Sequence, residues 1–152
     1  MMIDPLTDGV LWRRVVAWFI DALLIGVVVT VLWLVLVTFG LLTLGLGLPL
    51  LGVLPVVPIA YHTLFIAGGR SATPGQGIMD LSVRQVGTLA APDLIQAGLF
   101  TIGLWVTLAA GVVWLVATLF LPQKRAIHDL VSGLVVVRAQ ALTRGAAHGT
   151  MV

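Results

Sequence analysis

The feature that most limits the fold of this chain is the length of its stretches without charge. No Asp, Glu, Lys or Arg occurs from Ala22 to Gly69, and none occurs again from Leu94 to Gln123. A bilayer core about 30 Å thick is crossed by about 20 apolar residues of helix. Charged residues make up 9% of the chain, against about 25% in soluble domains. We therefore expect a small polytopic membrane protein, and neither a soluble globule nor a disordered chain.

The few polar residues also limit the classes of function. Eight Lys and Arg residues against six Asp residues leave a formal net charge of +2, which is too small for a nucleic-acid-binding surface. The absence of cysteine excludes disulfides, thiolate metal sites and thiol catalysis. Because the chain carries no Ser/His/Asp set, carboxylate pair or dinucleotide fingerprint, we expect no enzyme, no cofactor and no metal site.

Three apolar segments are expected to form helices. The first, about Trp12–Phe39, is interpreted as an uncleaved span because Asp21 interrupts what would otherwise resemble a signal peptide. The second, about Leu48–Ala67, contains three prolines, which kink a helix but are tolerated in a membrane. The third apolar run is Leu94–Leu121. The expected fold class is an all-α integral membrane protein, a compact bundle of three helices, or of four if the last run folds as a short hairpin, with a small interfacial loop and strand region.

Small residues spaced four apart mark two helix faces that allow close packing. They are Ala22, Gly26 and Thr30 in the first segment, and Gly103, Thr107 and Gly111 in the third. The partners that we expect are the lipid bilayer and either other membrane subunits or further copies of the chain, with no nucleic acid.

Arginines beside the apolar runs indicate the orientation. Because cytoplasmic loops are enriched in Lys and Arg, Arg13 and Arg14 are expected in the cytoplasm, and Arg70 and Arg84 return there after two spans. As a hairpin, the last run would keep the basic residues after it inside, but each arm of about 13 residues would reach only about 20 Å. A single crossing is long enough to span the bilayer, but it places the basic residues after the run outside the cytoplasm, against the enrichment of Lys and Arg in cytoplasmic loops.

Two short segments outside the spans are typical of strands. They are Leu81–Val86, which partly alternates, and the apolar run Leu134–Val137. Neither is stable alone, so we expect them to pair, and this pairing favours the hairpin. Residues 1–138 are expected to form one domain, followed by a flexible tail over residues 139–152.

Asp21 is the most anomalous residue, because an ionised carboxylate within a span costs at least about 2.5–3.5 kcal/mol. Counted from Arg14 as the interface, it lies about 10 Å deep. Two roles remain open: a proton or cation site, or a structural carboxylate satisfied by an arginine or by hydrogen bonds between helices. We favour the structural role.

Arg14 precedes Asp21 by two turns on nearly the same helical face. Because helical side chains lean toward the N-terminus, an acid on the cytoplasmic side reaches Arg14 more easily than Asp21 does. Asp129 is the candidate and Asp80 the reserve, and the alternative is that Arg14 is only a topology anchor. His128 beside Asp129 suggests a proton relay or metal pair, but the chain has too few ligands for a metal site.

Two further features have plain structural interpretations. His62 is expected to be a hydrogen-bonded residue, since no second His on a facing helix completes a haem site. The segment Ser71–Gly77 lacks the Lys and the glycine spacing of a phosphate-binding loop, so we expect a turn at the membrane interface.

Three motifs together resemble the RDD family of membrane proteins. They are Arg13-Arg14-Val-Val-Ala-Trp-Phe-Ile-Asp21, then Ala72-Thr-Pro-Gly75 with Leu81-Ser-Val-Arg84, and last Arg125-Ala-Ile-His-Asp129-Leu-Val-Ser-Gly133 with the valines that follow. The resemblance covers about residues 9–138 and implies a compact helical membrane domain. It identifies a polar core of Arg14, Asp21 and Asp129, supported by His128, Gly75 and Gly133. We expect a multi-pass protein of the bacterial cytoplasmic (inner) membrane with a cytoplasmic N-terminus.

The function of that family is unsettled, and transport, including cation/proton antiport for some members, has been proposed for it. This chain departs from the family pattern: Gln76 and Asp80 stand where a basic residue and a second glycine are usual, and Leu134 replaces a threonine. Because a transporter is expected to keep polar residues along its path, these losses favour a non-catalytic accessory or assembly subunit of a larger membrane complex. The alternative is a small transporter with Asp21 as its ion or proton site.

Overall fold

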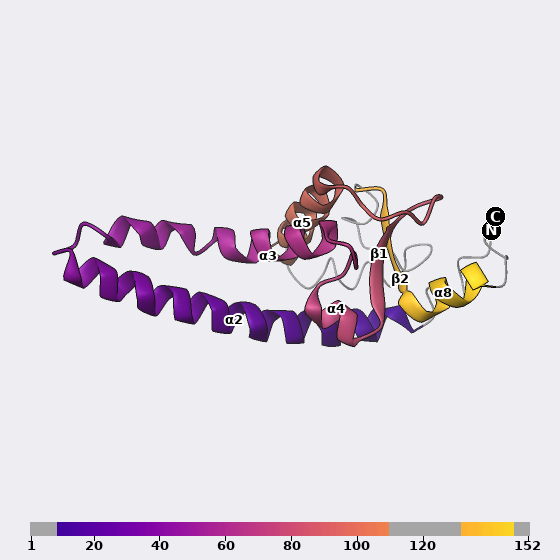
Figure 1. Ribbon diagram of the computed structural model, residues 1–152, viewed down its shortest axis with the longest axis horizontal. Coiled ribbons are helices and arrows are strands. Elements are labelled where there is room, and N and C mark those ends of the chain that lie inside the picture. The colour runs from indigo at the N-terminus through magenta and orange to yellow at the C-terminus, as the bar shows by residue number, and fades with distance from the viewer. Residues whose placement is uncertain (1–8, 110–131, 148–152) are drawn as a thin grey trace.

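The computed structural model describes residues 9–109 and 132–147. Its elements are α2 (Val10–Leu42), the 3-10 helix η1 (Leu48–Val53), α3 (Val56–Ala67), α4 (Pro74–Ile78), β1 (Leu81–Gln85), α5 (Leu94–Ala109), β2 (Leu134–Arg138) and α8 (Ala139–Ala147). α2 runs beside η1 and α3 as a long hairpin, and the other elements gather at one end of it (Figure 1). We call that end the head: α4, β1, β2 and α8 with the adjoining ends of α2, α3 and α5.

Helix α2 is the only described helix that is long and apolar enough to cross a membrane, and it confirms the helix expected over about 12–39. It begins after Gly9, whose φ of 67° suits glycine. At about 1.5 Å per residue, the charge-free part from Ala22 to Leu42 is about 31 Å long. That length matches a bilayer core of about 30 Å, which places Asp21 at the boundary of the apolar part.

The second apolar segment is interrupted, and not one continuous kinked helix as expected over about 48–67. Proline has no backbone N–H, so Pro58 cannot bond to the carbonyl of Leu54, which instead accepts from Val57 N at 3.2 Å. The chain therefore forms η1, turns at Leu54 and Pro55, and resumes as α3.

Strands β1 and β2 pair in antiparallel fashion, with Leu81 opposite Arg138 and Gln85 opposite Leu134. The expected pairing of the two strand-like segments is confirmed. Since hydrogen bonds hold the strands together, the chain between Gln85 and Leu134 starts and ends in the head.

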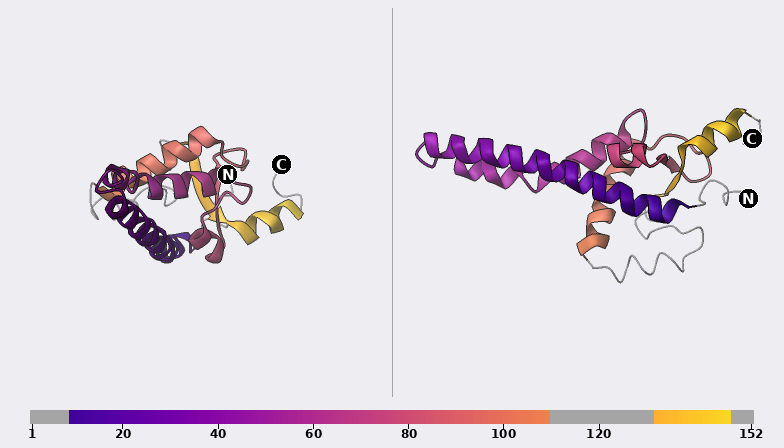
Figure 2. Two further views of the ribbon diagram at one scale, coloured as in Figure 1. Left: turned by 60° about the vertical axis from the view of Figure 1, so that its left-hand side comes forward. Right: turned by 90° about the horizontal axis from the view of Figure 1, so that it is seen from below.

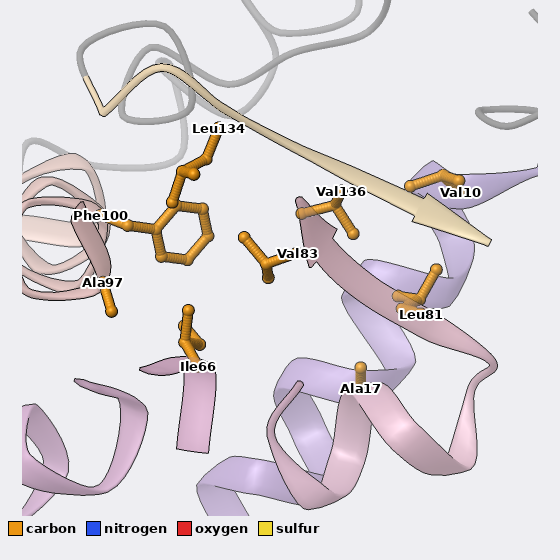
Figure 3. Packing of buried hydrophobic residues seen from close by; sticks show 9 residues of the cluster. All are labelled: Val10, Ala17, Ile66, Leu81, Val83, Ala97, Phe100, Leu134 and Val136. Atoms are coloured by element: carbon orange, nitrogen blue, oxygen red, sulfur yellow. The ribbon is translucent and has the colours of Figure 1, made fainter. Parts of the chain in front are cut away.

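The hydrophobic core lies where the strands meet α2, α3 and α5 (Figure 3). It consists of Val10, Ala17, Ile66, Leu81, Val83, Ala97, Phe100, Leu134 and Val136. Val135 and Val137 point to the other face of β2 and pack with Ala141 and Leu142 of α8. β2 is thus buried on both faces, which explains its unbroken apolar run.

Helix α8 corrects the expectation of a tail beginning at residue 139, because Ala139–Ala147 is helical and packs on β2. Of the third apolar run, the structure describes α5, which runs at a steep angle to α2 (Figure 2). The rest of that run lies outside the described residues. The described part thus has one helix of spanning length and two shorter apolar helices, and the expected three or four spanning helices stay a prediction.

Candidate functional site

Asp21 lies on the narrow face that α2 buries near the head. Ala17, Asp21 and Ile25 are spaced four apart and are the buried residues along this part of the helix. Only 3% of Asp21 is exposed. A carboxylate buried to this extent is costly unless hydrogen bonds satisfy it, so its partners decide what it does.

Three donors from two other elements reach the carboxylate. The hydroxyl of Tyr61 on α3 donates to Oδ1 at 2.9 Å, and the backbone N–H of Gly75 donates to the same oxygen at 2.8 Å. The hydroxyl of Thr73 donates to Oδ2 at 2.5 Å. We call these four residues the Asp21 cluster. Hydrogen bonds to an ionised group are the stronger kind, so the cluster joins α2 to α3 and α4.

Local sequence orients the Thr73 hydroxyl. Thr73 is the N-cap of α4, where its Oγ1 accepts from Gln76 N at 3.2 Å, and Gln76 Oε1 accepts from Thr73 N at 3.0 Å. Pro74 follows at the first helical position, where its missing N–H costs nothing. Because the oxygen of Thr73 is engaged as an acceptor, its hydrogen is directed to Asp21. This helix corrects the expectation that residues 71–77 are only a turn.

Gly75 is required by the close approach of α4 to α2. A Cβ at this position would overlap the carbonyl oxygen of Ala17 and lie 2.8 Å from Cγ of Asp21. A Cβ at Gly77 of the same short helix meets nothing within 4 Å. The glycine that the family resemblance marked as supporting therefore allows the N–H of α4 to reach Asp21.

Other polar residues fasten the head. Arg13 Nη1 donates to the carbonyl of Met79 at 2.9 Å, at the C-terminal end of α4, where a cation is favoured. Asp80, the reserve partner of Arg14, instead accepts from Gln140 N at 3.0 Å and lies 3.6 Å from Arg138 Nε. Asp80 has a φ of 59°, in the region that favours the glycine usual in the family.

The remaining polar-core residues are only partly within the described chain. Arg14 is half-buried in the first turns of α2. Asp129 and His128 lie outside the described residues, so the pairing of Arg14 with Asp129 stays a prediction. Gly133 lies in the turn before β2 with a φ of 66°, which explains a glycine at that position.

The rows of small residues face away from the described chain or fall partly outside it. Ala22, Gly26 and Thr30 are exposed, and a Cβ on Gly26 would meet nothing within 4 Å. Gly103 is half-buried on α5. The side chain of Thr107, like the whole of Gly111, lies outside the description. Close packing at these two rows stays a prediction.

His62 is a buried, hydrogen-bonded residue, as expected. Its Nδ1 lies 2.9 Å from the carbonyl of Pro58, and since a carbonyl only accepts, this nitrogen donates. The His62 ring also meets the edge of Trp105 on α5, with ring centroids 6.2 Å apart. Within residues 9–109 and 132–147, no group of three or more His, Cys, Asp or Glu could hold a metal ion.

Sequence reasoning missed the partners of Asp21. It assigned no role to Tyr61, and it placed Thr73 only in a turn at the membrane interface. The pattern Thr-Pro-Gly-Gln over residues 73–76 was the available signal, because Thr followed three residues later by Gln indicates a capping box and proline favours the first helical position.

An open groove of about 890 Å³ adjoins the Asp21 cluster, and Thr73 lines it.

Comparison with known proteins shows that a model of the RDD family matches residues 9–133. This range contains the whole Asp21 cluster. No curated protein and no solved structure matches the chain.

Proposed function

The chain belongs to the RDD family, a family of membrane proteins, and from this membership and the contacts of Asp21 we propose that it is a non-catalytic assembly subunit of a larger membrane complex. In this proposal the hairpin of α2, η1 and α3 presents apolar surface to partner helices, and the head stays at the cytoplasmic surface of a bacterial inner membrane.

The observation that carries the proposal is that the Asp21 cluster uses its polar groups internally. The carboxylate is buried, and its donors come from α3 and α4 of the same chain. A carboxylate bonded in this way fixes the geometry of three elements. An ion or proton carrier needs a group that exchanges its partners.

The hairpin supplies a surface for partners. Large apolar side chains such as Leu23 and Val27 are more than half exposed along α2. The small residues around Gly26 leave space beside them. Lipid alone satisfies apolar side chains, whereas a row of small residues lets the backbone of a second helix approach closely. This combination supports a helical partner in the membrane.

The positions of the arginines support the proposed orientation. The described arginines belong to the head or to the first turns of α2: Arg13, Arg14, Arg70, Arg84, Arg138 and Arg144. Strand pairing returns the chain after α5 to the same end, which supports the hairpin interpretation of the run between the strands. With the head in the cytoplasm, these residues satisfy the positive-inside rule.

Single cysteines test this orientation, because the chain has no native cysteine. Thr88 and Arg144 are exposed in the head, and Leu46 is exposed at the hairpin tip. In sealed right-side-out cells, an impermeant thiol reagent should label a cysteine at Leu46 and neither of the others. Labelling at Arg144 without labelling at Thr88 would contradict the paired topology.

Gentle purification tests the assembly role. We expect the chain to migrate with other subunits in fixed stoichiometry, and Gly26→Leu should release them while leaving the melting temperature unchanged, since no described residue packs there. Val28→Leu is the matched control, because Val28 is also exposed on α2. A homo-oligomer that survives Gly26→Leu would speak against the proposal.

The transporter alternative has one observation in its favour, which is that Thr73 both lines the open groove and bonds to Asp21. Liposomes loaded with a pH-sensitive dye separate the two functions. An amide does not titrate, so Asp21→Asn should abolish any cation-driven proton flux that Asp21 carries. If the wild type shows such flux and the folded variant does not, the protein is an antiporter and the assembly role is wrong.

A further inference from the structure

The open groove beside the Asp21 cluster has a chemistry that the assembly role does not use. It is bounded by the end of α3, the turn over residues 68–70, α4, β1 and α8. The end of α3, α4 and β1 lie where the charge-free hairpin joins the head, and α8 lies farther from the hairpin (Figure 1). In the orientation proposed above, the groove therefore opens at the level of the lipid headgroups of the cytoplasmic leaflet.

The charge of the groove comes from two arginines. Arg70 and Arg84 are the charged residues that line it. Within the described chain, the Arg70 guanidinium has no hydrogen bond or ion pair, and Arg84 donates only through Nε to Ser82 Oγ, at 3.1 Å. Arg138, by contrast, faces Asp80 at 3.6 Å. The groove thus holds two cationic groups without an acidic partner among the described residues.

The same groove has an apolar wall. Leu64 and Phe65 of α3 line it from the hairpin, and Ile78 and Leu142 line it from the head. Leu64 and Ile78 are 66% and 69% exposed, which is costly in water and favourable against an acyl chain. A cationic end beside an apolar wall fits a ligand that is anionic at one end and apolar at the other.

We propose that this groove binds an anionic phospholipid, with the phosphate at Arg70 and Arg84 and the acyl chain along Leu64 and Phe65. Guanidinium groups bind phosphate oxygens through two parallel hydrogen bonds. The contact from Arg84 to Ser82 already holds that side chain, so less conformational freedom is lost on binding. The inference goes beyond the assembly role; it rests on the orientation proposed above and not on the presence of partner subunits.

The test is a titration of the purified full chain in uncharged detergent, with lipid binding followed by native mass spectrometry. Phosphatidylglycerol should bind about 25-fold more tightly than diacylglycerol, which has the same acyl chains and no phosphate, since each interfacial arginine contributes about fivefold. Arg70→Gln and Arg84→Gln should each lower the affinity for phosphatidylglycerol about fivefold, and the double change should bring it to that of diacylglycerol. Arg144→Gln is the matched control, because Arg144 is exposed on α8 outside the groove, and should leave the affinity unchanged.

Three results would overturn the proposal: equal affinity for the two lipids, an equal loss with Arg144→Gln, or saturation by inorganic phosphate that displaces phosphatidylglycerol. The last result would assign the site to a soluble anion. Arg70 is exposed and has no side-chain partner among the described residues, so its variant should fold. If the double variant does not fold, Ile78→Asp decides, because it places a negative charge at an exposed position of the apolar wall. It should lower phosphatidylglycerol binding with the melting temperature unchanged, and unchanged binding would refute the site.

Discussion

Replacing Asp21 by leucine and by asparagine separates a structural carboxylate from a chemical one. Leucine has the same branched skeleton with bulkier ends and cannot accept a hydrogen bond, so Thr73 and the N–H of Gly75 lose their acceptor while buried. Each buried donor without a partner costs about 1–3 kcal/mol, which gives about 2–6 kcal/mol for Asp21→Leu. Tyr61 is half-buried and its hydroxyl can turn to water. A loss of this size is a large fraction of the whole stability of a typical domain, about 5–15 kcal/mol.

Asparagine should cost less. Its carbonyl can take the place of Oδ1, which receives Tyr61 and Gly75. Its NH₂ then faces the Thr73 hydroxyl, which rotates and accepts. The three contacts to residue 21 survive, but the charge is lost and the hydrogen of the buried Thr73 hydroxyl loses its acceptor, so we expect about 1–3 kcal/mol, the cost of one buried donor without a partner.

The assay is thermal unfolding in detergent, followed by the fraction of monodisperse protein that remains after heating. Asp21→Leu should lower the melting temperature and the expression strongly, and Asp21→Asn less. Phe19→Leu is the matched control, because Phe19 is exposed on the same helix, and it should match the wild type. If asparagine proves as damaging as leucine, the negative charge itself is required, and the structural interpretation fails.

Two other pairs of substitutions test further contacts. Gly75→Ala should lower the melting temperature by several degrees, because the new Cβ overlaps the Ala17 carbonyl. Gly77→Ala in the same helix is the control and should be neutral or stabilising. Equal effects of the two substitutions would contradict the close approach of α4 to α2. Arg14→Leu and Asp129→Leu should each cost about 3–5 kcal/mol if they form a buried pair, with the double change milder than the sum, and strictly additive losses in a thermal double-mutant cycle would exclude the pair.

The sequence predicted the elements whose signal is local. The absence of charge and the length of the first segment predicted α2, and the strand-like segments Leu81–Val86 and Leu134–Val137 form the observed sheet. The prolines predicted that the second segment is not a regular helix, but they did not predict where the helix begins again. The position of the break at Pro55 depends on which backbone N–H groups bond to the carbonyls that the prolines leave without a donor.

The partners of Asp21 were not predictable in the same way. Tyr61 and Thr73 are separated from Asp21 by 40 and 52 positions in the sequence, and no periodicity connects them. Helix α8 was missed for a related reason. Its sequence is weakly apolar, and it is ordered by packing of Leu142 on β2 and by the contact from Asp80 to Gln140 N, neither of which is visible along the chain.

The pairing of β1 with β2 has a consequence for biosynthesis. β1 leaves the ribosome before α5 and the apolar run that follows it, while its hydrogen-bond partner β2 comes after that run. Until β2 arrives, one edge of β1 lacks its partner, and the core side chains Leu81 and Val83 lack those of Leu134 and Val136. An unpaired strand edge invites aggregation and exposed apolar side chains are recognised by chaperones and proteases. Closure of the sheet therefore requires that the whole chain between the two strands has been synthesised, and a chain stalled before that point remains visible to quality control.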